Sequence, residues 1–353
     1  MEYSWMEYGG YEPFVPDEVY LHVPAFEELS YRQKLLADPQ TMSYNAGYDL
    51  SFKGYDREKG TIAFEKEDWA GWYESWINNQ PQRFYAYVMR KKDHLPLGEV
   101  CVHEDAENGW HETGVVIEAK YRSMGYGKQA LFLLMRHAFY DMGVRAMHNT
   151  FENERYPALA MHMECGFLHL GTNDGIVELI CGKPAFARFR KSRLYSRKLR
   201  GEDRKDVLDL YNSNPHYFEL CPPQPSEESV IRDMNALPPG TDPSHKHFVG
   251  WYEMKRLIGV CDLIEKYPDE DTLWIGLFMI RGTHQCEGLG TAVIERLCAE
   301  LAGKFRRIAL GCYENNTEGI SFWKQCGFVI TQVNKDGIAI MEKQLPAQEA
   351  SGL

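Results

Sequence analysis

Residues 117–143 read IEAKYRSMGYGKQALFLLMRHAFYDMG. It starts as the end of an apolar, β-branched run, turns through residues 122–127, and continues with apolar residues at helical spacing up to Gly143. The first N–H groups of a helix have no partner inside the helix, and they lie at the positive end of its dipole. Gly125 and Gly127 carry no Cβ, so a phosphate can approach the main chain there. The stretch therefore predicts an anion-binding turn between a strand and a helix.

The same pattern occurs a second time in the chain. Residues 280–301 read IRGTHQCEGLGTAVIERLCAEL, and the turn over 285–290 lies 163 residues after the turn over 122–127. A second landmark, Cys-Gly-Phe, occurs at 165–167 and again at 326–328, an offset of 161 residues. Two landmarks at nearly the same offset indicate an internal duplication.

Both turns resemble the [Arg/Gln]-x-x-Gly-x-[Gly/Ala] signature of the GNAT acetyltransferases, which bind the pyrophosphate of acetyl-CoA. The dinucleotide-binding fingerprint has another order of glycines, Gly-x-Gly-x-x-Gly. The resemblance implies an α/β protein with two tandem GNAT folds, each a mixed sheet of antiparallel strands followed by a parallel pair splayed by the signature helix. We expect an N-terminal domain over residues 1–185, with an extension over 1–18, and a C-terminal domain over 201–353. Residues 186–200, rich in Lys and Arg, are expected to form a solvated linker and the first strand of the second domain.

Composition limits the class of protein. The chain has 353 residues, 44% of them hydrophobic and 13% aromatic, which suits two or three domains with sizeable cores. No apolar run approaches 18 residues, the start does not resemble a signal peptide, and the nine cysteines include no C-x-x-C pair. We therefore expect a cytoplasmic protein without a membrane span, a disulfide or a metal site. The oligomeric state stays open between a monomer with two copies and a homodimer.

Charge bears on the partner. The formal net charge of −12 argues against nucleic acid and is compatible with a cationic amine substrate, although acidic residues also keep a cytosolic protein soluble. A nucleic-acid role for the basic stretch 183–200 is the less favoured alternative to a linker.

The resemblance assigns cofactor contacts to the turn amides and to the strand before each turn, where a main-chain N–H contacts the thioester oxygen. It also implies a cofactor contact from the Asn of an Asn-x-x-Ala motif. Asn316 stands at the expected spacing in the second copy, and Asn153 lies near that position in the first. The expected acetyl-CoA-binding residues are Val116, Ile117, Arg122, Ser123, Met124, Gly125, Tyr126, Gly127, Lys128 and Asn153 in the first copy, and Met279, Ile280, Gln285, Cys286, Glu287, Gly288, Leu289, Gly290, Thr291 and Asn316 in the second.

Many relatives carry a general base eleven residues before the Arg or Gln of the signature. That position is His111 in the first copy, with Glu112 beside it, and Trp274 in the second. His111 lies six residues before Ile117, so an unbulged strand points both to one face, whereas a bulge would turn Glu112 inward. An imidazole with a pKa near ~6.5 suits a base at neutral pH.

The family also places a Tyr, as general acid, four residues before Gly-Phe. His162 and Trp323 stand there, and an indole cannot protonate the thiolate. His162 is either a proton donor or a histidine satisfied within its helix. Asp262 and Glu265 on the preceding strand are the weaker candidates in the second copy.

These features predict an acetyl-CoA-dependent N-acetyltransferase that acts on a primary amine of a small molecule or peptide, with the faster chemistry in the first copy. Two alternatives remain: one or both copies only bind acyl-CoA or serve as a scaffold, or the protein makes peptide-like bonds as an aminoacyl-transferring relative.

Overall fold

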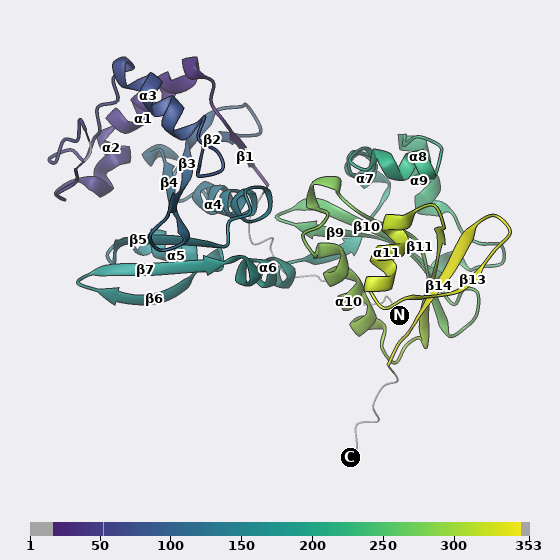
Figure 1. Ribbon diagram of the computed structural model, residues 1–353. Helices are drawn as coiled ribbons and strands as arrows, with labels where there is room; N and C mark the ends of the chain where they lie inside the picture. Colours follow the sequence, from purple (N-terminus) through teal and green to yellow (C-terminus); the bar gives the residue numbers. More distant parts are fainter. Residues whose placement is uncertain (1–16, 52, 347–353) are drawn as a thin grey trace. The chain divides into compact units, whose positions relative to one another are not determined.

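The computed structural model describes residues 17–51 and 53–346 (Figure 1). The chain divides between Phe189 and Arg190 into two compact units, called here the N-terminal and C-terminal domains. Each contains a seven-stranded mixed sheet with flanking helices. The predicted α/β class with two copies of one mixed-sheet fold is confirmed. The predicted extension over residues 1–18 lies outside the described residues except for its last two positions.

The sheet of the N-terminal domain has the order β1-β2-β3-β4-β5-β7-β6. Its strands are β1 (Val19–His22), β2 (Arg83–Arg90), β3 (Pro96–Asp105), β4 (Trp110–Ile117), β5 (Ala146–Glu152), β6 (Leu168–Asn173) and β7 (Ile176–Gly182). Strands β4 and β5 run parallel and pair through His111 with Met147 and Glu112 with His148. Beyond these pairs β4 continues to Ile117 without β5, so the sheet opens between the two strands.

Helices cover both faces of this sheet. They are α1 (Leu29–Ala37), α2 (Pro39–Met42), α3 (Lys66–Trp76), α4 (Tyr126–Arg136) and α5 (Tyr156–Glu164). Val116 faces a core cluster that contains Leu29 of α1 and Trp69 of α3, whereas Ile117 faces α4 at Gly127. Trp69 of α3 is buried in this cluster, and Trp72 and Tyr73 pack against it, because the three side chains recur at helical spacing.

The C-terminal domain repeats the arrangement, with the order β13-β14-β12-β11-β10-β9-β8. Its strands are β8 (Tyr195–Lys198), β9 (Lys246–Glu253), β10 (Arg256–Glu265), β11 (Thr272–Ile280), β12 (Arg307–Tyr313), β13 (Val329–Val333) and β14 (Ile338–Gln344). Its helices are α7 (Arg204–Asn212), α8 (Pro215–Leu220), α9 (Glu227–Asn235), α10 (Leu289–Leu301) and α11 (Thr317–Gln325). The parallel pair β11–β12 extends over Thr272–Ile275 and then opens.

The expectation of a solvated linker after the first domain is wrong. Residues Lys183–Ser192 form helix α6, and Arg190 in its last turn is only 1% exposed. Strand β8 follows and forms an edge of the second sheet. The sequence does not predict strands β6 and β13, because both are exposed edge strands that lack a buried apolar face.

No helix in the described ranges combines the length and the apolar character that a membrane crossing requires.

Candidate cofactor and acyl-transfer site

The two glycine-rich turns have the same backbone conformation. Ser123 and Cys286 have positive φ angles of 61° and 60°, and Gly125 and Gly288 follow with 81° and 73°. The left-handed glycine is in each copy the residue directly before the helix, which begins at Tyr126 or Leu289. The N–H groups of the first helical turn, which include those of the predicted Gly127, Lys128, Gly290 and Thr291, therefore point out of the helix end without an intrahelical acceptor.

The Arg or Gln of the signature fixes each turn to the strand before it. Arg122 Nε donates to the carbonyl of Ile117 at 3.1 Å, and Gln285 Nε2 donates to the carbonyl of Ile280 at 3.1 Å. Arg122 also donates to the carbonyl of Thr41. These side chains thus shape the turn by binding backbone carbonyls.

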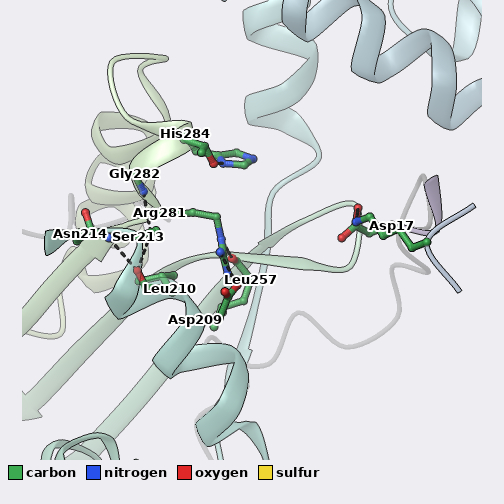
Figure 2. A network of polar contacts seen from close by, with 11 residues as sticks. Asp17, Asp209, Leu210, Ser213, Asn214, Leu257, Arg281, Gly282 and His284 are labelled. Carbon is green, nitrogen blue, oxygen red and sulfur yellow. Dashed lines mark hydrogen bonds and ion pairs between the residues drawn. The ribbon is translucent and has the colours of Figure 1, made fainter. Parts of the chain in front are cut away.

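A second brace joins the start of each turn to the first helical layer. The N–H of Ala119 donates to Thr41 Oγ1, and the N–H of Gly282 donates to Ser213 Oγ, both at 3.0 Å. Figure 2 shows the C-terminal brace, together with the buried Arg281, whose Nη1 donates to Asp209 Oδ2 at 2.6 Å. The duplication therefore extends to hydroxyl contacts that the sequence did not reveal.

The last signature glycine of each copy packs against the helix that follows β5 or β12. A Cβ on Gly127 would lie 3.0 Å from Met161 Sδ, and one on Gly290 would lie 3.1 Å from the ring of Phe322. A side chain at either position would therefore displace a neighbour as well as cover the helix N-terminus.

The open edge of β4 presents backbone groups of alternate residues. The N–H of Glu118 donates to Leu97, and in an antiparallel pair both main-chain groups of a residue face the same side. Val116 therefore faces β3, while Val115 and Ile117 face the opening. In the C-terminal domain, the bond from the N–H of Arg281 to Ile258 places Phe278 and Ile280 at the opening and turns Met279 toward β10.

Glu112 and His148 meet where β4 and β5 separate. Glu112 Oε1 lies 2.6 Å from His148 Nδ1 and accepts a hydrogen bond from Trp110 Nε1 at 2.9 Å. The other ring nitrogen of His148 lies 3.2 Å from Glu178 Oε1, and the ring stacks on Trp110 with centroids 4.2 Å apart. His148 is 5% exposed, so the opening of the sheet holds a buried imidazole between two carboxylates.

His111 is separated from this group. The pairing of β3 with β4 has no register shift, so His111 shares a face with Ile117 and Glu112 points to the opposite face. Burial lowers the pKa of His111. From the sequence, Glu112 is expected to turn inward only if β4 has a bulge. The strand has no bulge, and Glu112 still meets Trp110 and His148.

His162 is satisfied within its surroundings. Its Nδ1 donates to the carbonyl of Ala158 at 2.8 Å, so its Nε2 is the acceptor for Asn149 Nδ2 at 2.9 Å. The side chain is 2% exposed, and burial lowers its pKa to about 4. The neutral ring therefore has its single N–H engaged by the backbone.

The C-terminal copy has a β-bulge at the corresponding opening. Asp262 pairs with Leu277 and Leu263 with Ile275, so Gly276 is the extra residue. A Cβ on Gly276 would lie 2.5 Å from Asp262 Oδ2, which shows that the carboxylate covers the bulge.

Asp262 is engaged by a lysine. Lys246 Nζ lies 2.8 Å from Asp262 Oδ1, and both side chains are at most 10% exposed. Burial raises the pKa of Asp262, and the bond from Lys246 opposes that effect. Glu265 lies three residues further along the strand and points to the other face, where it meets His247 at 3.1 Å. The structure therefore does not bring Asp262 and Glu265 together.

The bulge also changes which residues correspond. The residues eleven positions before the two signatures are His111 and Trp274. Strand β11 has one extra residue, Gly276, between this position and the signature, whereas β4 has none, so the two positions are not equivalent. With this insertion, Trp274 corresponds to Glu112, and Ala309, its partner on β12, corresponds to His148. The C-terminal domain thus lacks both members of the Glu112–His148 pair.

The residues at the Asn-x-x-Ala and Tyr positions of the family motif make contacts within the fold. Asn316 caps α11 by accepting a hydrogen bond from the N–H of Gly319 at 2.9 Å, and Trp323 is buried among aromatic side chains. In the first copy, Arg155 at the strict Asn position donates to the carbonyl of Tyr44 at 2.9 Å, and the nearby Asn153 donates its N–H to Gly175.

A family model described as "Acetyltransferase (GNAT) family" matches residues 38–167 and 206–328, which include both turns. The chain belongs to the GNAT acetyltransferase family. No curated protein matches it.

Similar solved structures are GNAT-type enzymes, and each covers about half of this chain. An acetyltransferase from Thermus thermophilus is 24% identical, over 43% of this chain and 97% of that one, with a TM-score of 0.40. A spermidine N-acetyltransferase from Vibrio cholerae, in complex with CoA and spermine, is 13% identical over 48% and 98%, with a TM-score of 0.39. The ribosomal-protein-S18-alanine N-acetyltransferase from Escherichia coli is 14% identical over 45% and 99%, with a TM-score of 0.34.

Sequence reasoning missed several residues that contact the two turns and the opening of the first sheet in this GNAT protein. Thr41, Ser213, His148 and Glu178 lie outside the signature, and only the fold brings them to the turns and the opening. The cysteines are free, and Cys165 and Cys326 are buried, whereas Cys286 in the second turn is exposed.

Proposed function

We propose that this GNAT protein is an acetyl-CoA-dependent N-acetyltransferase that acts on a primary amine of a small molecule or peptide, with the chemistry in the N-terminal copy. The observation that supports this best is the Glu112–His148 pair at the opening between β4 and β5, in the same domain as an intact cofactor turn. Acetyl-CoA, when bound, supplies an acyl thioester that an amine can attack.

The residues present fit acetyl-CoA. The N–H groups of Tyr126, Gly127 and Lys128 would hold its diphosphate at the helix N-terminus. Val115 and Ile117 face the opening, so their main-chain groups would pair with the pantetheine arm and provide an N–H for the thioester oxygen. We place this contact at Ile117 and Ile280, because Val116 and Met279 face the neighbouring strands.

Glu112 is the proposed proton acceptor. An alkyl ammonium has a pKa near ~10.4 and must lose a proton before it attacks. The side chain of Glu112 is 25% exposed and that of His148 is 6% exposed, so a substrate can reach the carboxylate while the imidazole behind it orients it. His162 offers no free N–H for the leaving thiolate; an ordinary thiol has a pKa near ~8.5, so the thiolate can leave unprotonated.

For the C-terminal copy we propose acyl-CoA binding without fast chemistry. Its turn matches the first turn in backbone conformation, but Trp274, Ala309 and Trp323 replace the titratable groups and Lys246 engages Asp262.

The test is a panel of amines, including polyamines, amino sugars and peptide N-termini, with acetyl-CoA and a thiol reagent that reports released CoA. An amine-dependent thiol release that disappears in Gly127→Glu supports the proposal. Tight acetyl-CoA binding without thiol release from any amine class would instead favour a binding or scaffolding protein.

A further inference from the structure

A buried ion cluster lies beside the second cofactor turn. Arg190 Nε and Nη2 bind the two carboxylate oxygens of Glu253 at 2.7 and 2.8 Å, and its Nη1 binds Glu287 Oε2 at 2.8 Å. The Arg190 side chain is fully buried and both glutamates are 5% exposed. His284 Nε2 lies 3.7 Å from Glu253 Oε2. A cluster buried to this extent is strongly held in place.

Glu287 is an unusual residue for an anion-binding turn. It lies directly before the left-handed Gly288, where the first copy has Met124, which is 56% exposed. A carboxylate at this place would repel a diphosphate if it pointed outward. Instead it is turned inward, and Arg190 supplies the opposite charge.

The next residue of the chain lies at the turn itself. A Cβ on Gly288 would lie 3.5 Å from Lys191 Nζ, so the ammonium stands next to the turn backbone. Lys191 forms no ion pair with any residue in the described part of the chain, and it is partly exposed. An ammonium beside helix N-terminal amides is a suitable ligand for a phosphate.

We infer that Arg190 and Lys191, which lie outside the signature, complete the second cofactor site. Arg190 is a positioning residue that neutralises Glu287 and keeps it below the turn. Lys191 binds the diphosphate of acyl-CoA. The inference rests on the proposed binding of acyl-CoA by the C-terminal copy, and it assigns a role to the basic stretch that composition alone suggested was a linker.

The Lys191 contact is tested by calorimetry in a Gly127→Glu background, so that the heat reports the second turn. Lys191→Gln should raise the Kd at least fivefold, equally for CoA and dephospho-CoA, because both carry the diphosphate. Lys198→Gln, an exposed basic residue of the same stretch, should leave the Kd unchanged. An effect of Lys191→Gln on CoA alone would overturn the diphosphate assignment.

The Arg190 role is tested in the same background. Arg190→Gln should raise the Kd at least tenfold, and Arg190→Gln with Glu287→Gln should recover most of the affinity, because no carboxylate then opposes the diphosphate. Glu287→Gln also removes a buried carboxylate that has lost its partner, so the rescue supports the proposed role only where Arg190→Gln itself melts as a folded protein. Thermal melting checks that each variant is folded. If Arg190→Gln does not fold, the Kd of Lys191→Gln alone decides whether this stretch contributes to the second cofactor site.

The two proposals fail in different ways. If Gly127→Glu alone binds no CoA, the C-terminal copy is not a cofactor site and the proposed function of that copy is wrong. If it binds CoA and neither Lys191→Gln nor Arg190→Gln changes the Kd, only the inference about these two residues is wrong.

Discussion

Glu112 Oε1 and His148 Nδ1 lie 2.6 Å apart at the last paired residues of β4 and β5. The contact joins two strands at the point where the sheet opens, so it fixes a carboxylate on β4, five residues before Ile117. His148 is flanked by a second carboxylate, Glu178, which holds the imidazole from its other side. These contacts hold the Glu112 carboxylate in one position, as its proposed role of proton acceptor requires.

Glu112→Gln should lower kcat/KM for the amine by at least tenfold, because a positioned general base typically contributes roughly 10²- to 10⁴-fold. The Kd for acetyl-CoA should stay nearly unchanged, because the carboxylate lies away from the turn. Steady-state kinetics with thiol release, beside calorimetry, measures both quantities. Glu107→Gln, in the exposed turn between β3 and β4, is the matched control.

His111→Ala separates the two sequence candidates. Its side chain points to the face opposite Glu112, so kcat/KM should change less than threefold. A large loss in His111→Ala together with normal turnover in Glu112→Gln would assign the base to His111 and contradict the role proposed for the pair.

The sequence predicted the conformation of the turns better than the contacts of the proposed catalytic residues, for a physical reason. A turn is local: its glycines, its flanking strand and its helix are adjacent in the chain, so a signature can describe it. The Glu112–His148 pair joins positions 36 residues apart through one strand register, and the Gly276 bulge changed the count along β11 by one residue. Spacing along the chain cannot report either effect.

Acetyl-CoA should bind with a stoichiometry near two per chain, because both turns have the same backbone conformation. Gly127→Glu and Gly290→Glu should each remove one site, since the new side chain meets Met161 or Phe322 and carries a negative charge to an anion site. Calorimetry measures the stoichiometry. Gly71→Glu, where a Cβ meets nothing within 4 Å, is the matched control.

A stoichiometry of one, with Gly290→Glu silent, would mean that the C-terminal turn is not a cofactor site. Its glycines and helix would then be retained for packing alone.

Stability should depend on His162 between pH 6.5 and 4. Its pKa is lowered to about 4 in the folded protein, whereas the unfolded chain binds the proton near ~6.5. The unfolded state therefore gains protons first as the pH falls, and the free energy of unfolding decreases by about 3 kcal/mol over this interval. Urea titrations at several pH values should show a decrease that is smaller by this amount in His162→Gln.

The exposed His169, mutated to Gln, is the control for this titration. Turnover of His162→Gln at neutral pH should be close to that of the parent, because the ring has no free N–H. A loss of more than tenfold in kcat, with normal acetyl-CoA affinity, would restore His162 as the general acid.

The buried Asp262–Lys246 pair should stabilise the C-terminal domain. Asp262→Asn leaves a buried ammonium without its carboxylate, and breaking such a pair typically costs about 3–5 kcal/mol. The unfolding transition of the C-terminal domain should therefore shift strongly in urea, whereas Glu270→Gln, which removes an exposed partner of Lys266, should shift it little. Asp262→Leu with Lys246→Met should recover part of the stability, because no unpaired charge is then buried.

Turnover should respond differently from stability. At a temperature where Asp262→Asn remains folded, its kcat/KM should match that of the parent, since the proposed base is Glu112 in the other domain. If Asp262→Asn abolished thiol release while folded, and Glu112→Gln had no effect, the carboxylate over the Gly276 bulge would be the base. The chemistry would then belong to the C-terminal copy, and the N-terminal copy would be the one that binds without reacting.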